Sequence, residues 1–191
     1  SLTPGLAPVI VAIVDTGLDL THPVFTGSNA IWVNGGEIAR NGIDDDKNGY
    51  VDDINGYNFA YGSASPTDDE GHGTHCAGIV LGTSQDITLT PLQPAKIKIM
   101  PLKFLDSYGS GSTSNAISAI NYAVLMGAKV ISNSWGGGSP SDSLLAAIAY
   151  AYDHKVLFVA AAGNNGTNND STPTYPANYN VPNVISVAAT T

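Results

Sequence analysis

Short apolar runs rich in valine, isoleucine and alanine recur along the 191-residue chain, and each ends at polar or turn-forming residues. The first run, residues 9–14 (VIVAIV), has no polar position, so it lacks the alternation of a strand with one face in water. Unbroken runs of this kind are typical of strands buried on both faces of a parallel sheet. We predict core strands at residues 9–14, 97–105, 129–134, 156–161 and 184–188.

Two segments between these runs carry apolar residues three and four positions apart, which predicts helices that end near Gly127 and His154. Strands and helices that alternate in this way form right-handed crossovers. We therefore predict a single α/β domain over residues 1–191, a doubly wound, mostly parallel sheet with helices on both faces and ligands at the strands' carboxyl ends. The spaced residues are Ala116, Ile117, Ile120, Ala123 and Val124 in the first helix and Leu144, Leu145, Ile148 and Tyr152 in the second.

The charge of the chain excludes several classes of partner. Lysine and arginine number 7 against 16 aspartate and glutamate residues, which gives a net charge of −9. Such a chain offers no basic surface to phosphates or anionic lipid, so we expect neither nucleic acid nor a membrane as a partner. No apolar run approaches the ~20 residues of a membrane span. Cys76 is the only cysteine, which rules out an intramolecular disulfide.

Two polar residues lie where predicted strands end. Asp15 follows the first strand, although a carboxylate in that place is often only a turn cap. Asn164 follows the run 156–161, where its amide is suited to donating a hydrogen bond to an oxyanion, although an ordinary Asn-Gly turn is the simpler interpretation. Both are candidates for catalysis that need a partner.

The octapeptide 71–78 (GHGTHCAG) supplies the candidate base. Two glycines flank His72 and let the backbone approach a neighbouring segment closely. Cys76 follows four residues later on the same helical face, so a metal site and a Cys–His nucleophile pair are alternatives. The lack of further ligands, and the small and apolar residues that follow the cysteine, favour a packed thiol instead.

Four motifs together resemble the successive signatures of the subtilisin-like serine proteases, in both order and spacing. They are residues 15–17 (DTG), the octapeptide 71–78, residues 132–137 (SNSWGG) and residues 162–164 (AGN). The resemblance implies that His72 is the general base, that Asp15 orients and stabilises its imidazole, and that Asn164 stabilises the oxyanion. It also implies a secreted serine endopeptidase that cleaves polypeptides through an Asp-His-Ser triad.

The same resemblance implies a peptide clamp built from two extended segments. The substrate would lie between them as an added strand, and a pocket near Thr174 would hold its principal side chain. The residues expected to bind substrate are Gly109, Ser110, Gly111, Ser134, Trp135, Gly136, Ala162 and Gly163.

The nucleophile of this family lies in a Gly-Thr-Ser-Met-Ala motif after the oxyanion asparagine, and these 191 residues contain no such motif. We therefore expect a partial peptidase domain, truncated before the nucleophile helix, which hydrolyses nothing efficiently by itself and self-associates through its uncovered core surface. Ser84, in residues 82–84 (GTS), resembles the motif, but it lies only 12 residues after His72 and before Asn164, in the wrong order.

An acidic segment, residues 44–53 (DDDKNGYVDD), resembles the first half of an EF-hand loop. Position twelve of that pattern is Asn55 rather than glutamate, so the loop is not a full EF-hand. Consecutive carboxylates repel one another unless a cation lies beside them, and we expect a structural calcium ion. The acids at 68–70 are expected to cap the helix of His72. The candidate ligands are Asp44, Asp46, Asn48, Tyr50, Asp52 and Asp53.

Two other functions were open on sequence grounds. Residues 109–114 (GSGSTS) lie between a strand and a helix as in a dinucleotide-binding fold, but Ser114 replaces the third glycine and the strand at 129–134 ends without a ribose-binding acid. A pseudoprotease that only binds peptides or calcium is the more serious alternative. The joint presence of Asp15, His72 and Asn164 argues against it.

Overall fold

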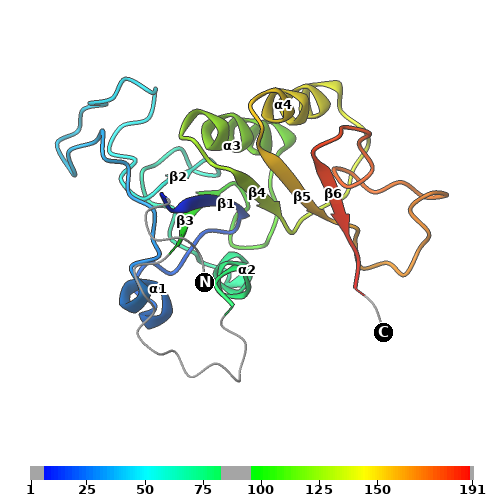
Figure 1. Ribbon diagram of the computed structural model, residues 1–191, viewed down its shortest axis with the longest axis horizontal. Coiled ribbons are helices and arrows are strands. Elements are labelled where there is room, and N and C mark those ends of the chain that lie inside the picture. Colours follow the sequence, from blue (N-terminus) through cyan, green and yellow to red (C-terminus); the bar gives the residue numbers. More distant parts are fainter. Residues whose placement is uncertain (1–6, 83–95, 190–191) are drawn as a thin grey trace.

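The computed structural model describes residues 7–82 and 96–189, and in them a six-stranded sheet of order β2-β3-β1-β4-β5-β6. Every neighbouring pair of strands is parallel. Helices α3 and α4 cover one face of the sheet, and α1 and α2 lie on the other (Figure 1). The predicted doubly wound parallel sheet is confirmed. The strands are β1 Val9–Asp15, β2 Tyr57–Asn58, β3 Ile97–Lys103, β4 Val130–Asn133, β5 Leu157–Ala161 and β6 Val184–Val187, and the helices are α1 Pro23–Ser28, α2 His72–Val80, α3 Thr113–Leu125 and α4 Asp142–Asp153.

The core consists of two apolar layers on the two faces of the sheet. Under α3 and α4, buried side chains such as Leu102, Ile120 and Phe158 pack together. Under α1 and α2, a smaller cluster includes Ile13 and Phe25. Strand β1 is buried on both faces because its side chains enter the two layers alternately, Ala12 and Val14 one layer and Val11 and Ile13 the other, which is why its sequence carries no polar residue before Asp15.

The strand ends differ slightly from the sequence predictions, for identifiable reasons. The run 97–105 overestimates β3, because the N–H groups of Phe104 and Leu105 both donate to the carbonyl oxygen of Asp15 and turn the chain out of the sheet. Strand β6 is not a core strand: it lies at the sheet edge, and Val187 is half exposed. Gly127 follows α3 with a φ of 81°, and His154 caps α4, as predicted.

No helix within residues 7–82 and 96–189 has the length and apolar character needed to cross a membrane.

Candidate active site

His72 and Asp15 meet where the first turn of α2 lies against the carboxyl end of β1. The His72 Nδ1 atom is 2.7 Å from the Asp15 Oδ1 atom. The Asp15 side chain is 1% exposed, whereas that of His72 is 45% exposed. With Nδ1 donating to the carboxylate, Nε2 is the unprotonated nitrogen and is free to accept a proton from a reacting group.

The close approach of α2 to the turn after β1 depends on Gly73 and Thr16. The Gly73 N–H donates to the Thr16 hydroxyl oxygen over 2.8 Å. A Cβ atom at Gly73 would lie only 2.4 Å from the carbonyl oxygen of Gly17, so no larger residue fits without displacing the backbone. The glycine after the histidine is therefore what allows the base to reach its acid.

Two of the three acids at 68–70 cap α2, as predicted. Asp68 accepts hydrogen bonds from the backbone of Glu70, Gly71 and Thr74 and from the Thr74 hydroxyl. Burial alone would raise the pKa of Asp68, but these hydrogen bonds outweigh it and lower the pKa to about 2. Glu70 accepts from the His72 N–H over 2.7 Å. Asp69 has a different partner, the buried Lys103.

The electrostatics of the pair suit a general base. The hydrogen bond from His72 to Asp15, aided by the charges of Asp15, Glu70 and Asp68, raises the pKa of His72 against the opposing effect of burial. Burial raises the pKa of Asp15 and outweighs the hydrogen bonds from His72 and Thr16. The Oδ2 atom of Asp15 is buried with no hydrogen-bond partner in the described part of the chain, which adds to that cost. The acid is held in place by the fold rather than by solvation.

Cys76 lies beside the pair without joining it as a nucleophile. Its Sγ atom is 3.9 Å from both ring nitrogens of His72, and one oxygen of Asp15 lies close to both side chains. Burial raises the pKa of the Cys76 thiol, so the thiolate that a nucleophile or metal ligand requires is disfavoured. Half buried against the apolar layer under α2, the thiol acts mainly as a packing group.

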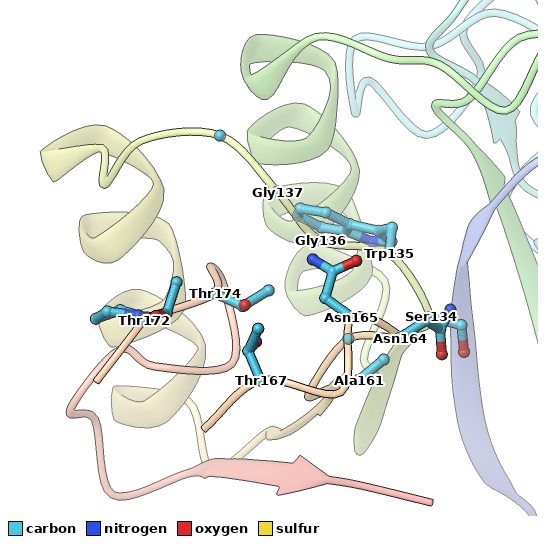
Figure 2. Close-up of a pocket in the computed structure, with 13 residues that line it drawn as sticks. Ser134, Trp135, Gly136, Gly137, Ala161, Asn164, Asn165, Thr167, Thr172 and Thr174 are labelled. Carbon is cyan, nitrogen blue, oxygen red and sulfur yellow. The ribbon is translucent and has the colours of Figure 1, made fainter. Parts of the chain in front are cut away.

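The segments that follow β4 and β5 enclose a pocket of about 390 Å³ (Figure 2). Asn164 and Gly163 form one wall, and Ser134, Trp135 and Gly136 form another. Thr174 completes the lining, and its side chain lies 3.6 Å from where a Cβ atom of Gly163 would be. The structure thus brings the oxyanion candidate into the same pocket as one predicted substrate segment.

The second predicted segment lies across a neighbouring groove. Gly109, Ser110 and Gly111 line a cavity of about 340 Å³ together with Trp135 and Gly136. A Cβ atom at Gly111 would lie 2.5 Å from the carbonyl oxygen of Phe104, so this residue must be glycine for the segment to fold against β3. Residues far apart in sequence therefore form the two sides of one groove.

Ala162 differs from its neighbours. It does not line the pocket in the described structure, because its N–H donates to Val187 and its carbonyl oxygen accepts from the Asn169 side chain. Both of its backbone groups are used to hold the loop after β5. Ser84 lies outside the described residues. Among the described residues, no serine hydroxyl is hydrogen-bonded to His72.

The motifs, their order and this geometry agree with the comparison with known families. The model of the subtilase family, Peptidase_S8, matches residues 7–191. The chain belongs to the subtilase family. This membership confirms the resemblance found from the sequence and removes the dinucleotide-binding alternative.

Relatives of this subtilase chain are proteases. Thermitase of Thermoactinomyces vulgaris is 36% identical over 180 residues, which cover 94% of this chain and 54% of thermitase. The cell wall-associated protease of Bacillus subtilis is 40% identical over 186 residues, which cover 97% of this chain and 18% of that protein. The crystal structure of a cold adapted subtilisin-like serine proteinase matches 97% of this chain and 56% of its own, with a TM-score of 0.68 and 28% identity. The subtilase chain thus spans about half of thermitase and of that structure.

The acidic loop of the subtilase chain gathers three carboxylates. Oxygen atoms of Glu37, Asp46 and Asp53 lie within 4.8 Å of one another. Asp53 is 0% exposed, and no lysine or arginine in the described residues pairs with any of the three. The negative charges of the three carboxylates repel one another. A site made of oxygen ligands, with two or three carboxylates among them, is the kind that calcium prefers. The residues present fit that ion.

The other predicted ligands have different roles in this structure. Asp44 accepts from the backbone of Asn48 and Gly49, and Asp52 accepts from the N–H groups of Asn41 and Gly42. The Asn48 amide donates to Asp46 and Asp53, while its oxygen accepts from Tyr50. Tyr50 itself packs its ring against Tyr57, Phe59 and Tyr122. The structure brings together Asp46, Asn48 and Asp53 of the predicted set.

Glu37 is the member of this cluster that the sequence reasoning missed. Its two carboxylate oxygens accept from the N–H groups of Asp45, Asp46 and Asp52, so it holds both ends of the acidic segment. The Tyr122 hydroxyl, from α3, donates to Asp53 over 2.5 Å. Burial and the nearby Asp53 raise the pKa of Tyr122, which keeps that donor protonated. The loop is thereby tied to the helix layer.

Proposed function

We propose that this chain supplies the general base, its orienting acid and the oxyanion donor of a secreted serine endopeptidase. The observation that carries the proposal is the 2.7 Å contact between an exposed His72 and a buried Asp15 at a strand end in a subtilase. His72 Nε2 would take the proton of a serine nucleophile and return it to the leaving amine. The Asn164 amide would donate to the oxyanion that forms on the attacked carbonyl. The nucleophile itself would come from sequence beyond the residues described above.

The two grooves support a polypeptide as the substrate. A peptide in extended conformation can pair its backbone with segments on both sides, here residues 109–111 and 134–136. The pocket beside Asn164 then receives one side chain near the scissile bond. Backbone pairing would supply affinity for any sequence, and the pocket near Thr174 would supply preference. Cleavage of an unstructured protein such as casein by the product of the complete reading frame tests this function.

Replacement of Asn164 tests the oxyanion role directly. In the complete protein we expect Asn164→Ala to lower kcat by about 10²–10³-fold, the loss measured for the corresponding amide of the relative subtilisin, with KM little changed. The reason is that the amide bonds the oxyanion, which exists only in the transition state. Steady-state hydrolysis of a chromogenic peptide measures both constants. Asn168→Ala, in the same exposed loop but outside the pocket, is the matched control, and an equal loss there would contradict the assignment.

We also propose that the acidic loop binds a structural calcium ion. Glu37, Asp46 and Asp53 would hold the ion, and the ion would offset the repulsion between their carboxylates. The ion would have a structural and not a catalytic role, because its carboxylate ligands hold a loop and a helix together and do not face the peptide grooves.

Removal of calcium is expected to destabilise the chain. At a calcium concentration 100 times Kd, binding to the folded state contributes about 2.7 kcal/mol. For a domain of this size, a chelator should then lower Tm by about 5–10 °C. Differential scanning fluorimetry with and without EGTA measures the shift. Asp53→Asn should abolish the response to calcium, whereas Asp170→Asn, on an exposed loop, should keep it; a calcium-independent Tm in the unaltered chain would contradict the proposal.

A further inference from the structure

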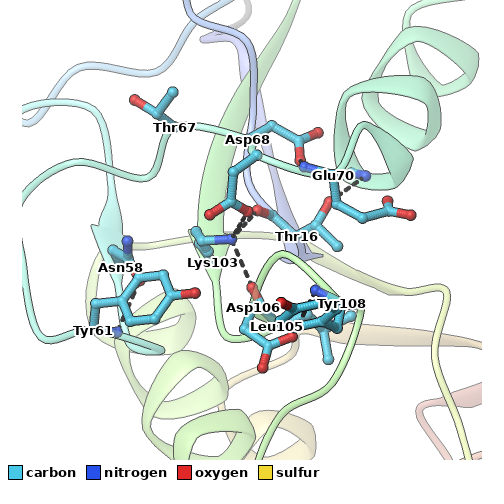
Figure 3. A network of polar contacts seen from close by, with 12 residues as sticks. Thr16, Asn58, Tyr61, Thr67, Asp68, Glu70, Lys103, Leu105, Asp106 and Tyr108 are labelled. Atoms are coloured by element: carbon cyan, nitrogen blue, oxygen red, sulfur yellow. Dashed lines mark hydrogen bonds and ion pairs between the residues drawn. The ribbon is translucent and has the colours of Figure 1, made fainter.

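Lys103 is a buried cation for which neither the catalytic groups nor the calcium loop accounts. It is the last residue of β3, and its side chain is 1% exposed. Lysine is almost never fully buried unless its charge is paired, because removing an ammonium group from water is costly. Figure 3 shows its Nζ atom at the centre of a network of polar contacts. Because burial of this charge costs free energy, we expect the Lys103 side chain to have a specific role.

Three acceptors surround the Lys103 ammonium group, one for each of its protons. Nζ donates to the carbonyl oxygens of Thr16 and Leu105, both over 2.7 Å (Figure 3). It also donates to Asp69 Oδ1 over 2.6 Å. The Tyr61 ring lies 5.7 Å away on a further side. All donors of the ammonium group are therefore satisfied, in a geometry that fixes three separate segments relative to one point.

Each of these segments carries part of the active site. Thr16 follows Asp15 and accepts the Gly73 N–H through its hydroxyl group. Asp69 lies three residues before His72. Leu105 lines the groove that also contains Gly109 to Gly111. Lys103 therefore joins the acid, the approach to the base and one wall of the peptide groove.

We propose that Lys103 is a positioning residue that holds the His72–Asp15 pair and the groove wall at Leu105 in fixed positions relative to each other. It touches neither substrate nor the reacting atoms; it acts through Thr16, Asp69 and Leu105. Its removal would let α2 drift from the turn after β1, and the groove wall from β3. This inference rests on the proposed function for its consequence in catalysis, but the geometry of the pair is measurable without catalysis.

The test is an NMR titration of the His72 imidazole in the 191-residue chain and its Lys103→Met variant. The titratable groups near the His72 ring are Asp15 on β1, Asp68 and Glu70 in the segment before α2, and the Cys76 thiol on α2 itself. Loss of a nearby positive charge would by itself raise the pKa of His72. A looser contact with Asp15 lowers it instead. We expect His72 to titrate at a pH lower by about 0.5 or more, since an opposite charge in contact shifts a pKa by about 1–3.

A second variant covers the case in which Lys103→Met does not fold. Lys103→Met combined with Asp69→Asn removes both charges of the pair, so the partly exposed Asp69 carboxylate is not left without its cation. We expect the same fall in the pKa of His72 and, in the complete protein, a rise in KM for peptides. Lys98→Met, on the same strand, is the control and should change neither. A folded Lys103 variant with a lower Tm but an unchanged His72 titration would overturn the inference. Absence of peptidase activity in the unaltered complete protein would instead overturn the proposed function.

Discussion

In the complete protein, His72→Ala should abolish measurable peptidase activity. We expect a loss in kcat of about 10⁶-fold, the magnitude measured when the base is removed from the relative subtilisin. The physical reason is that a serine hydroxyl is a weak nucleophile unless a base takes its proton, and Nε2 of His72 is the ring nitrogen that Asp15 does not bind. Hydrolysis of a chromogenic peptide at high enzyme concentration measures the residual rate.

His75→Ala is the matched control for this substitution. His75 lies on the same helix in the same octapeptide, but its side chain is exposed and has no contact with Asp15. We expect its activity and Tm to remain close to those of the unaltered protein. A loss of only a few fold in His72→Ala, or an equal loss in His75→Ala, would contradict the role of His72.

Asp15→Asn should lower kcat by about 10⁴-fold, the loss measured for this exchange in a serine protease of another fold. An asparagine amide in that place donates to Nδ1, so the imidazole proton moves to Nε2 and the base can no longer accept one. The pH profile should change as well. Activity requires neutral His72, whose pKa Asp15 raises, so the rise of activity with pH should move to lower pH in the variant.

Asp153→Asn is a suitable comparison, because that carboxylate is exposed at the end of α4. It should leave both kcat and the pH profile unchanged. Circular dichroism should show that Asp15→Asn keeps the fold, since the exchange preserves side-chain volume. A rising limb that stays at the same pH, with a kcat within tenfold of the original, would show that Asp15 does not orient His72.

The central strands of the sheet were predictable from sequence because burial on both faces leaves few choices of residue. Strands β1, β3, β4, β5 and β6 all coincide with predicted runs to within two residues. The two residues of β2 and the six of α1 are too short to show a period. Helix α1 is instead defined locally, by the His22 side chain that caps it and by Pro23 at its first turn.

The candidate site was predictable only where it is local in sequence. The octapeptide around His72 contains the glycines that allow its close packing. The roles of Glu37 and Lys103 instead depend on distant contacts: Glu37 binds Asp52, 15 positions away, and Lys103 binds Asp69, 34 positions away. One signal for Lys103 was present: a lysine directly after the apolar residues 99–102 (IMPL) of a predicted core strand. No such signal marks Glu37, and the engagement of Ala162 with β6 depends on sheet pairing alone.

Labelling with a fluorophosphonate, which reacts with activated serines, tests the central claim most directly. The 191-residue chain and the product of the complete reading frame are incubated with the probe and compared on one gel. We expect the complete protein to be labelled, its label to disappear in His72→Ala, and the 191-residue chain to remain unlabelled. Absence of label from both forms would contradict the assignment of a serine protease and favour a binding role, and label on the 191-residue chain would contradict the exclusion of Ser84.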